Sequence, residues 1–74
     1  NIKIYPNPVD TYCFIETIEN NSIINIYSIQ GILQKQIFSK ALLIKLDLKD
    51  LSSGLYIIEI LQNHSKEYKK IILR

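Results

Sequence analysis

Isoleucine dominates this chain and restricts the structures that it can form. Sixteen of the 74 residues are Ile and nine are Leu, whereas Ala and Val occur once each. β-Branched side chains pack well on a pleated, half-buried surface and lose rotamer freedom in a helix. The chain has no Ala-rich stretch and no apolar pattern with a helical period. We therefore expect an all-β domain.

Seven short apolar segments separated by polar turns predict seven strands. Most of the segments alternate apolar with polar residues, as a strand with one buried face does. Short strands that recur roughly every 8 to 12 residues are typical of an Ig-like antiparallel β-sandwich, and a small barrel is the alternative. The predicted strands are residues 2–5, 12–16, 24–27, 33–38, 44–48, 54–60 and 66–74.

The same alternation predicts which side chains fill the core. In most of the strands the charged residues fall on one parity, so the apolar residues of the other parity should point inward. We also expect Leu51 to tuck under a sheet from the turn that contains it. The predicted core is Val9, Cys13, Ile15, Ile24, Ile26, Ile44, Leu46, Leu48, Tyr56, Ile58, Ile60, Ile71 and Leu73.

Size and charge exclude several classes of protein. A chain of 74 residues makes one small domain that hides only ~60% of its unfolded surface. Nine Lys and Arg against seven Asp and Glu give a net charge of +2, which is too slight an excess to indicate nucleic-acid binding. No apolar run reaches the ~20 residues that span a bilayer. Because Met is absent, we expect residues 1–74 to be a fragment of a longer protein.

Few residues could support catalysis or metal binding. Cys13 is the only cysteine and His64 the only histidine. One thiol and one distant imidazole make neither an internal disulfide nor a complete metal site. They also fail to supply a nucleophile, a base and an orienting group at any supported spacing. We expect Cys13 to be a small buried hydrophobe and the domain to be non-catalytic, with no cofactor or metal.

Prolines and glycines mark special backbone positions. Tyr5-Pro6-Asn7-Pro8 removes two backbone donors from any strand ladder, so this segment should lie on a sheet edge or at a strand crossing. Gly31 offers the positive φ that a tight hairpin requires. Gly54 opens a predicted strand, where either a positive φ or a close neighbour would exclude a side chain.

The last third of the chain is typical of a terminal hairpin, whose second strand ends at Arg74. We expect Tyr56 to be a core aromatic whose hydroxyl reaches a polar partner at the rim. Lys69, Lys70 and Arg74 would form a solvated face or protect an edge from unwanted strand pairing. A final strand with a basic edge can itself be what a partner recognises.

Four motifs occur in a fixed order over nearly the whole chain. They are Tyr5-Pro6-Asn7-Pro8, Ile26-Tyr27-Ser28-Ile29-Gln30-Gly31, the stretch from Leu46-Asp47-Leu48 to Leu51-Ser52-Ser53-Gly54-Leu55-Tyr56-Ile57-Ile58, and Lys69-Lys70-Ile71-Ile72. In this order and spacing they resemble the C-terminal sorting domain of the type IX secretion system, in its type A form. The chain departs from the family pattern at Ser28, where Asp or Asn is frequent, and at Ile32, where Lys is common. Ser28 can still accept a local backbone hydrogen bond, so the turn is kept while its charge is lost.

The resemblance implies a non-catalytic signal for an attached N-terminal passenger. The passenger would cross the periplasm and leave through an outer-membrane translocon, to be secreted or held at the cell surface. The implied partners are the translocon, a shuttle protein and a surface sortase that exchanges the domain for a lipid anchor. In the family, export is tied to the Gly-x-Tyr element and the lysine-bearing last strand. These fall here on Gly54, Tyr56 and Lys69 or Lys70, with Arg74 displayed beside them.

Two further expectations concern binding. A carbohydrate- or protein-binding β-sandwich appended to an enzyme is the alternative function, with tyrosines as the platform. The five tyrosines lie on different predicted strands and several should face inward, which favours the sorting function. Two open sheet edges with apolar strands also predict a homodimer formed by strand addition or exchange.

Overall fold

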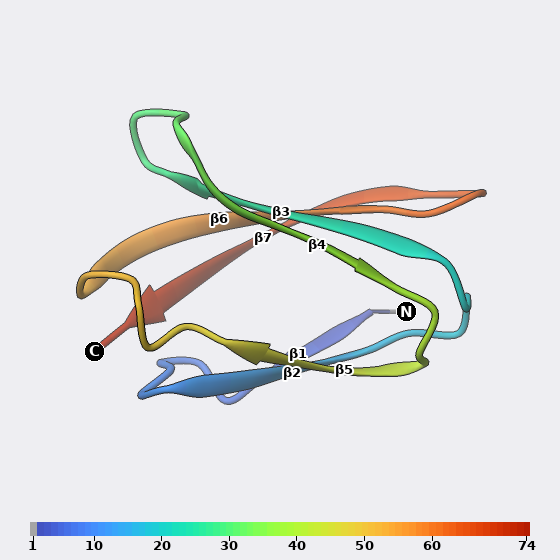
Figure 1. Cartoon of the computed structure of the whole chain (residues 1–74), viewed down its shortest axis with the longest axis horizontal. Coiled ribbons are helices and arrows are strands. Elements are labelled where there is room, and N and C mark those ends of the chain that lie inside the picture. The colour runs from blue at the N-terminus through green and yellow to red at the C-terminus, as the bar shows by residue number, and fades with distance from the viewer. Residues whose placement is uncertain (1) are drawn as a thin grey trace.

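The computed structural model describes residues 2–74, which form seven strands in two antiparallel sheets, while Asn1 of the predicted domain lies outside the described residues. One sheet has the order β1-β2-β5 and the other β4-β3-β6-β7, and the two sheets face each other as layers (Figure 1). The predicted all-β, Ig-like sandwich is confirmed, and the strands do not close into a barrel. The strands are β1 (Lys3–Tyr5), β2 (Tyr12–Glu16), β3 (Ser22–Ser28), β4 (Leu33–Ser39), β5 (Leu43–Asp47), β6 (Gly54–Leu61) and β7 (Lys66–Leu73).

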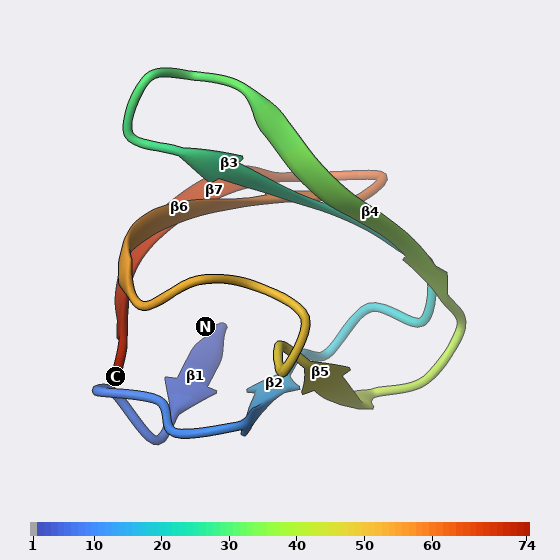
Figure 2. The same ribbon diagram turned by 60° about the vertical axis from the view of Figure 1, so that its left-hand side comes forward.

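The chain passes between the layers three times. The connections β2–β3, β4–β5 and β5–β6 cross from one sheet to the other, whereas β3–β4 and β6–β7 are hairpins within the larger sheet (Figure 2). Most predicted strand ends shift by one or two residues. Leu48 lies just beyond β5 and is still held in place, because its N–H donates to the carbonyl of Thr11 at 2.9 Å.

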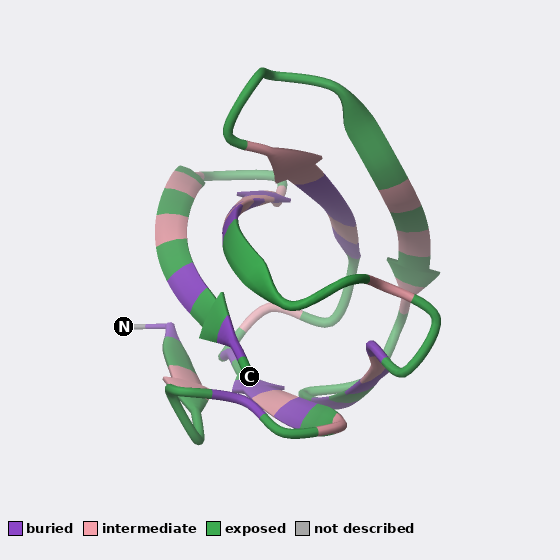
Figure 3. Ribbon diagram, turned by 90° about the vertical axis from the view of Figure 1, so that its left-hand side faces the viewer, coloured by how far each residue is buried: buried purple, intermediate pink, exposed green. Residues whose placement is uncertain are grey.

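The core lies between the sheets and consists of the side chains that alternation predicts. Every member of the predicted set is at most 7% exposed, and Leu51 packs against this cluster from the β5–β6 connection. Bands of buried and exposed residues alternate along the end of β7 (Figure 3). Ile2, at 8% exposed, adds to the core from the chain start.

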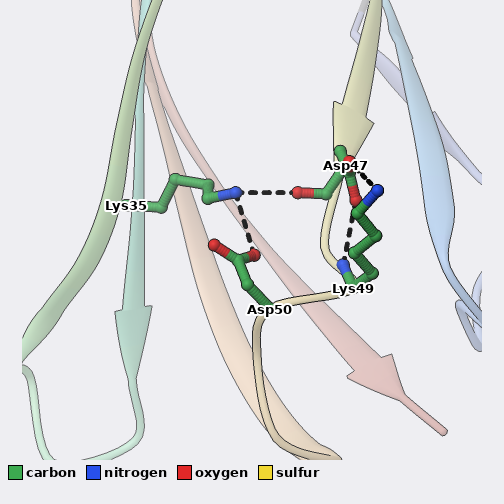
Figure 4. Close-up of polar contacts among 4 residues, drawn as sticks. All are labelled: Lys35, Asp47, Lys49 and Asp50. Atoms are coloured by element: carbon green, nitrogen blue, oxygen red, sulfur yellow. Dashed lines mark hydrogen bonds and ion pairs between the residues drawn. The ribbon is translucent and has the colours of Figure 1, made fainter.

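Lys35 ties the open edge of the larger sheet to the smaller one. From β4, its Nζ donates to the carbonyl of Asp47 at 2.9 Å and pairs with Oδ1 of Asp50 at 3.0 Å (Figure 4). Lys49 completes the group, since its N–H donates to Oδ1 of Asp47 at 3.0 Å. The hydrogen bond from Lys35 is the main cause that lowers the pKa of the Asp50 carboxyl. These contacts hold the β5–β6 connection against β4.

A row of polar side chains crosses all four strands on the outer face of the larger sheet. Gln36 donates to Oδ1 of Asn25 at 2.7 Å, and Asn25 donates to Oε1 of Glu59 at 2.9 Å. The hydroxyl of Tyr68 donates to Oε2 of Glu59 at 2.9 Å, and that of Tyr27 to Oε1 at 3.3 Å. Because these partners lie on neighbouring strands, the row fixes the strand register.

Glu59 should make the stability of the domain sensitive to acid. Its pKa is lowered, first by the hydrogen bond from Asn25 and then by that from Tyr68. The charged form therefore stabilises the fold fully above the ordinary pKa of 4.5, and this stabilisation is lost as pH falls through the lower folded value. Thermal midpoints measured from pH 7 to pH 3 should fall more steeply for the wild type than for Glu59→Gln. Parallel pH profiles would contradict this role.

Candidate functional site at one end of the sandwich

The four sequence motifs meet at one end of the sandwich, which we call the motif end. In the larger sheet, Ser28 pairs with Tyr56 and Gly54 pairs with Leu73. An isolated bridge joins Val9 to Leu73, so the chain start reaches the same place. Figure 1 shows these connections together at its left side. The motif end comprises residues 6–11, 28–32, 49–56 and 70–74.

Asn7 binds the outer edge of β7 through its side-chain amide. Its Nδ2 donates to the carbonyl of Lys70 at 3.1 Å, and its Oδ1 accepts from the N–H of Ile72 at 3.0 Å. Val9 continues the contact, since its N–H donates to the carbonyl of Ile72 at 2.7 Å and its carbonyl accepts from the N–H of Arg74 at 2.8 Å. The proline segment therefore lies at a sheet edge, as predicted, and both of its prolyl peptide bonds are cis.

Gly54 and Tyr56 shape the start of β6. Gly54 has a φ of 151°, and no atom lies within 4 Å of the position that a Cβ would occupy. The positive φ, and not a close neighbour, therefore explains why glycine occupies this position. Tyr56 is 7% exposed, and its hydroxyl donates to the carbonyl of Ser52 at 2.6 Å. This is the tyrosine corner of Ig-like folds, and it confirms the predicted core aromatic with a polar partner.

Replacement of Tyr56 by Phe should destabilise the domain while keeping the core filled. The change deletes one hydrogen bond and leaves a carbonyl without its partner, which costs about 1–2 kcal/mol. Urea denaturation at pH 7 measures the free energy of unfolding. Ser52→Ala is the matched control, because Ser52 accepts through its backbone, and it should change little. Equal stability of Tyr56→Phe and the wild type would mean that the hydrogen bond of the tyrosine corner does not stabilise the domain.

The three basic residues of the terminal segment 69–74 do not share one face. Lys70 and Arg74 are exposed, and Nε of Arg74 lies 3.2 Å from Oδ1 of Asp10. Lys69 lies on the opposite, inward parity of β7, half-buried, with its Nζ 3.6 Å from Oε1 of Glu67. Of the two lysines that the resemblance implicates, only Lys70 is fully displayed.

Lys70 and Arg74 flank an apolar surface on the outer face of the larger sheet. Ile72 lies between them along the chain and pairs with Leu55 on β6. Ile72 is 49% exposed and Leu55 38%. Exposed apolar side chains bordered by charges are typical of protein contact surfaces. We call Leu55, Lys70, Ile72 and Arg74 the basic-apolar strip.

The β3–β4 turn completes the motif end. Gly31 has a φ of 85°, which confirms its predicted positive value. The N–H of Ser28 donates to the carbonyl of Ile32 at 2.9 Å, and the hydroxyl of Ser28 accepts from the N–H of Ile32 at 3.3 Å. Ser28 therefore makes the local hydrogen bond predicted for it. Ile29 and Ile32 are each 61% exposed, so the turn adds apolar surface here.

Three residues considered from the sequence lie outside the motif end, namely Tyr5, Cys13 and His64. Tyr5 points from β1 to the outer face of the smaller sheet, where its hydroxyl donates to Glu16. Cys13 is fully buried, as predicted, and burial raises the pKa of its thiol to about 11. His64 is exposed, with Nδ1 3.6 Å from Oε1 of Glu19.

Within residues 2–74, no three His, Cys, Asp or Glu side chains gather in a way that could hold a metal. Nor does a helix there have the length and apolarity to cross a membrane. A hollow of about 440 Å³ lies at the opposite end from the motif end, with Ile23, Phe38 and Leu61 among its lining residues.

Sequence reasoning missed how the start of the chain is joined to its end. The sequence places Asn7 only in an edge segment and gives no reason to select Asp10. The sequence does carry one signal: because prolines at 6 and 8 have no N–H, Asn7 alone among residues 6–8 can donate to a neighbouring strand. The identity of the partner strand had no local signal.

Comparison with known proteins bears on the family and the fold of the chain. Residues 3–74 match a family model described as secretion system C-terminal sorting domain. The whole chain also superposes on part of PorZ, described as an essential bacterial surface component of the type-IX secretion system of Porphyromonas gingivalis, with a TM-score of 0.84 and 16% identity. That match covers 100% of this chain and 11% of the PorZ chain, and at this identity it shows the fold alone. No curated protein matches the sequence significantly. The chain belongs to the family of C-terminal sorting domains of the type IX secretion system.

Proposed function

We propose that this domain is the export signal of an N-terminal passenger, which it directs from the periplasm across the outer membrane through the type IX translocon. The passenger is then secreted or held at the cell surface. The observation that carries the proposal is the convergence of the four family motifs on the motif end. Contacts of Asn7 and Val9 with β7 join segments more than sixty residues apart, so the signal is a folded surface.

The basic-apolar strip is the surface that the translocon or its shuttle protein contacts. Lys70 and Arg74 supply exposed positive charge on either side of Ile72. Gly54 and Tyr56 act indirectly, because their roles are to set the start of β6 and to fix the corner before it. Lys69 supports β7 from its inward face. After export, a surface sortase removes the domain and exchanges it for a lipid anchor.

A reporter fusion tests the proposal. Residues 1–74 are joined to the C-terminus of a reporter that carries a signal peptide, in a host with a type IX system. Reporter activity should appear outside the outer membrane, and it should stay in the periplasm in a matched strain without the translocon. Retention in the periplasm of the intact strain would contradict the proposal.

We also propose that the domain associates with a second copy through the open edge of β4. In the larger sheet, β4 pairs only with β3, whereas residues 7 and 9 cover part of the β7 edge. An uncovered strand edge favours pairing with another strand. Light scattering should show a mass that rises with concentration, and Phe38→Lys should suppress that rise. The control is Ile29→Lys, at an exposed turn position. A constant monomer mass would contradict the proposal.

A further inference from the structure

Three aromatic side chains lie side by side on the outer face of the smaller sheet. Tyr5 on β1 and Phe14 on β2 are direct cross-strand partners, and Tyr12 lies two residues before Phe14 on the same face. The ring centroids of Tyr5 and Phe14 are 5.9 Å apart, with 30° between the ring planes. Tyr5 and Tyr12 are 40% and 39% exposed. We call these three residues the aromatic platform.

Polar groups of both signs surround the aromatic platform. The hydroxyl of Tyr5 donates to the Glu16 carboxylate, and Nζ of Lys45 lies 4.1 Å from the ring centroid of Tyr12. The register places Asp47 opposite Tyr12 and Lys3 opposite Glu16. Two cations and two anions therefore border the rings: Lys3, Lys45, Glu16 and Asp47.

We propose that the aromatic platform binds a neutral glycan chain. A sugar ring has an apolar C–H face that stacks on an aromatic ring, while its hydroxyl groups hydrogen-bond to donors and acceptors at the rim. The balanced rim charges give no attraction for a polyanion such as a nucleic acid. An exposed cation–π contact is weak, so the Lys45 ammonium can turn to a sugar hydroxyl.

The form of the surface also favours a glycan chain over a small enclosed ligand. Small-molecule sites are usually concave, whereas these aromatic rings line the open outer face of a sheet. The five tyrosines lie on five different strands, as expected, but the expectation that several of them face inward is wrong, because among the five only Tyr56 is buried. Tyr5 and Tyr12 come together with Phe14 because β1 and β2 are antiparallel neighbours. This inference goes beyond the export function and does not depend on it.

Affinity gel electrophoresis of the 74-residue chain tests the inference. The probes are four neutral polysaccharides, namely laminarin, xyloglucan, mannan and dextran, with heparin as an anionic comparison. At least one neutral polysaccharide should retard the wild type. Tyr5→Ala and Phe14→Ala should each weaken that binding by about tenfold, the loss expected for one aromatic stacking partner. The matched control is Tyr68→Ala on the other sheet, 58% exposed, which should bind like the wild type.

Nuclear magnetic resonance of the wild type gives a test that needs no variant to fold. Amide shifts caused by the retarding polysaccharide should be confined to β1, β2 and β5. The inference is overturned if no neutral polysaccharide retards the chain, if the platform variants bind as well as the wild type, or if the shifts map to the larger sheet. Retardation by heparin alone would also overturn it, since that would indicate attraction by charge.

Discussion

Removal of residues 69–74 should unfold the domain. The deleted segment contains Ile71 and Leu73, which are 1% and 3% exposed, and it carries five of the eight residue pairs between β6 and β7. Loss of a buried Ile or Leu side chain costs about 2–5 kcal/mol, whereas a domain of this size is stable by only about 4–11 kcal/mol in total. Far-ultraviolet circular dichroism on heating should show no cooperative transition for the truncated chain.

A cooperative transition near the wild-type midpoint would mean that β7 is dispensable for the fold. The expected unfolding also bears on export experiments. A truncated domain would lack its fold as well as its signal, so loss of export after this deletion would not show which of the two matters. Substitutions on the displayed face of β7 are therefore the informative changes.

Alanine substitutions at two neighbouring residues of β7 should differ strongly in their effect on the free energy of unfolding. Leu73→Ala removes a buried side chain and should lower the free energy of unfolding by about 2–5 kcal/mol. Ile72→Ala changes a side chain that is 49% exposed and should lower it by less than about 1 kcal/mol. Urea denaturation of both variants at pH 7 measures the difference. If the two effects were reversed, the register of β7 against β6 would be shifted by one residue.

The sheet faces could be predicted because strand periodicity is local. Along β5, Ile44 and Leu46 alternate with Leu43, Lys45 and Asp47, so the sequence itself indicates which side is buried. The same holds for β6, where Glu59 separates two buried isoleucines. Turn chemistry was also local: Gly31 has the positive φ that its position in a hairpin predicted.

Contacts between distant segments could not be predicted in the same way. Nothing near Asn7 indicates that its amide pairs with β7, because that contact depends on how the two sheets meet at their edges. No feature of the sequence indicates that Lys35 hydrogen-bonds to Asp47 on β5 and to Asp50 in the β5–β6 connection. The neighbouring rings of Tyr5 and Phe14 likewise depend on a register that forms only in the folded sheet.

For the candidate site, sequence motifs identified the residues and the structure separated their roles. Gly54 and Tyr56 belong to the framework, through a positive φ and a tyrosine corner. Lys70 and Lys69 are adjacent in sequence, and strand alternation places them on opposite faces. Lys70 and Arg74 therefore remain as the displayed charges that a partner could contact.

We propose that the export machinery recognises the basic-apolar strip on a folded domain. The most direct test is the secreted fraction of a reporter fused to residues 1–74 with Lys70→Glu and Arg74→Glu. The matched control, Lys40→Glu with Lys66→Glu, makes the same change of net charge at two exposed positions away from the motif end. Circular dichroism first verifies that both variant domains are folded. The strip variant should then stay in the periplasm, and the control should be secreted. Equal secretion of the two fusions would show that Lys70 and Arg74 are not recognised.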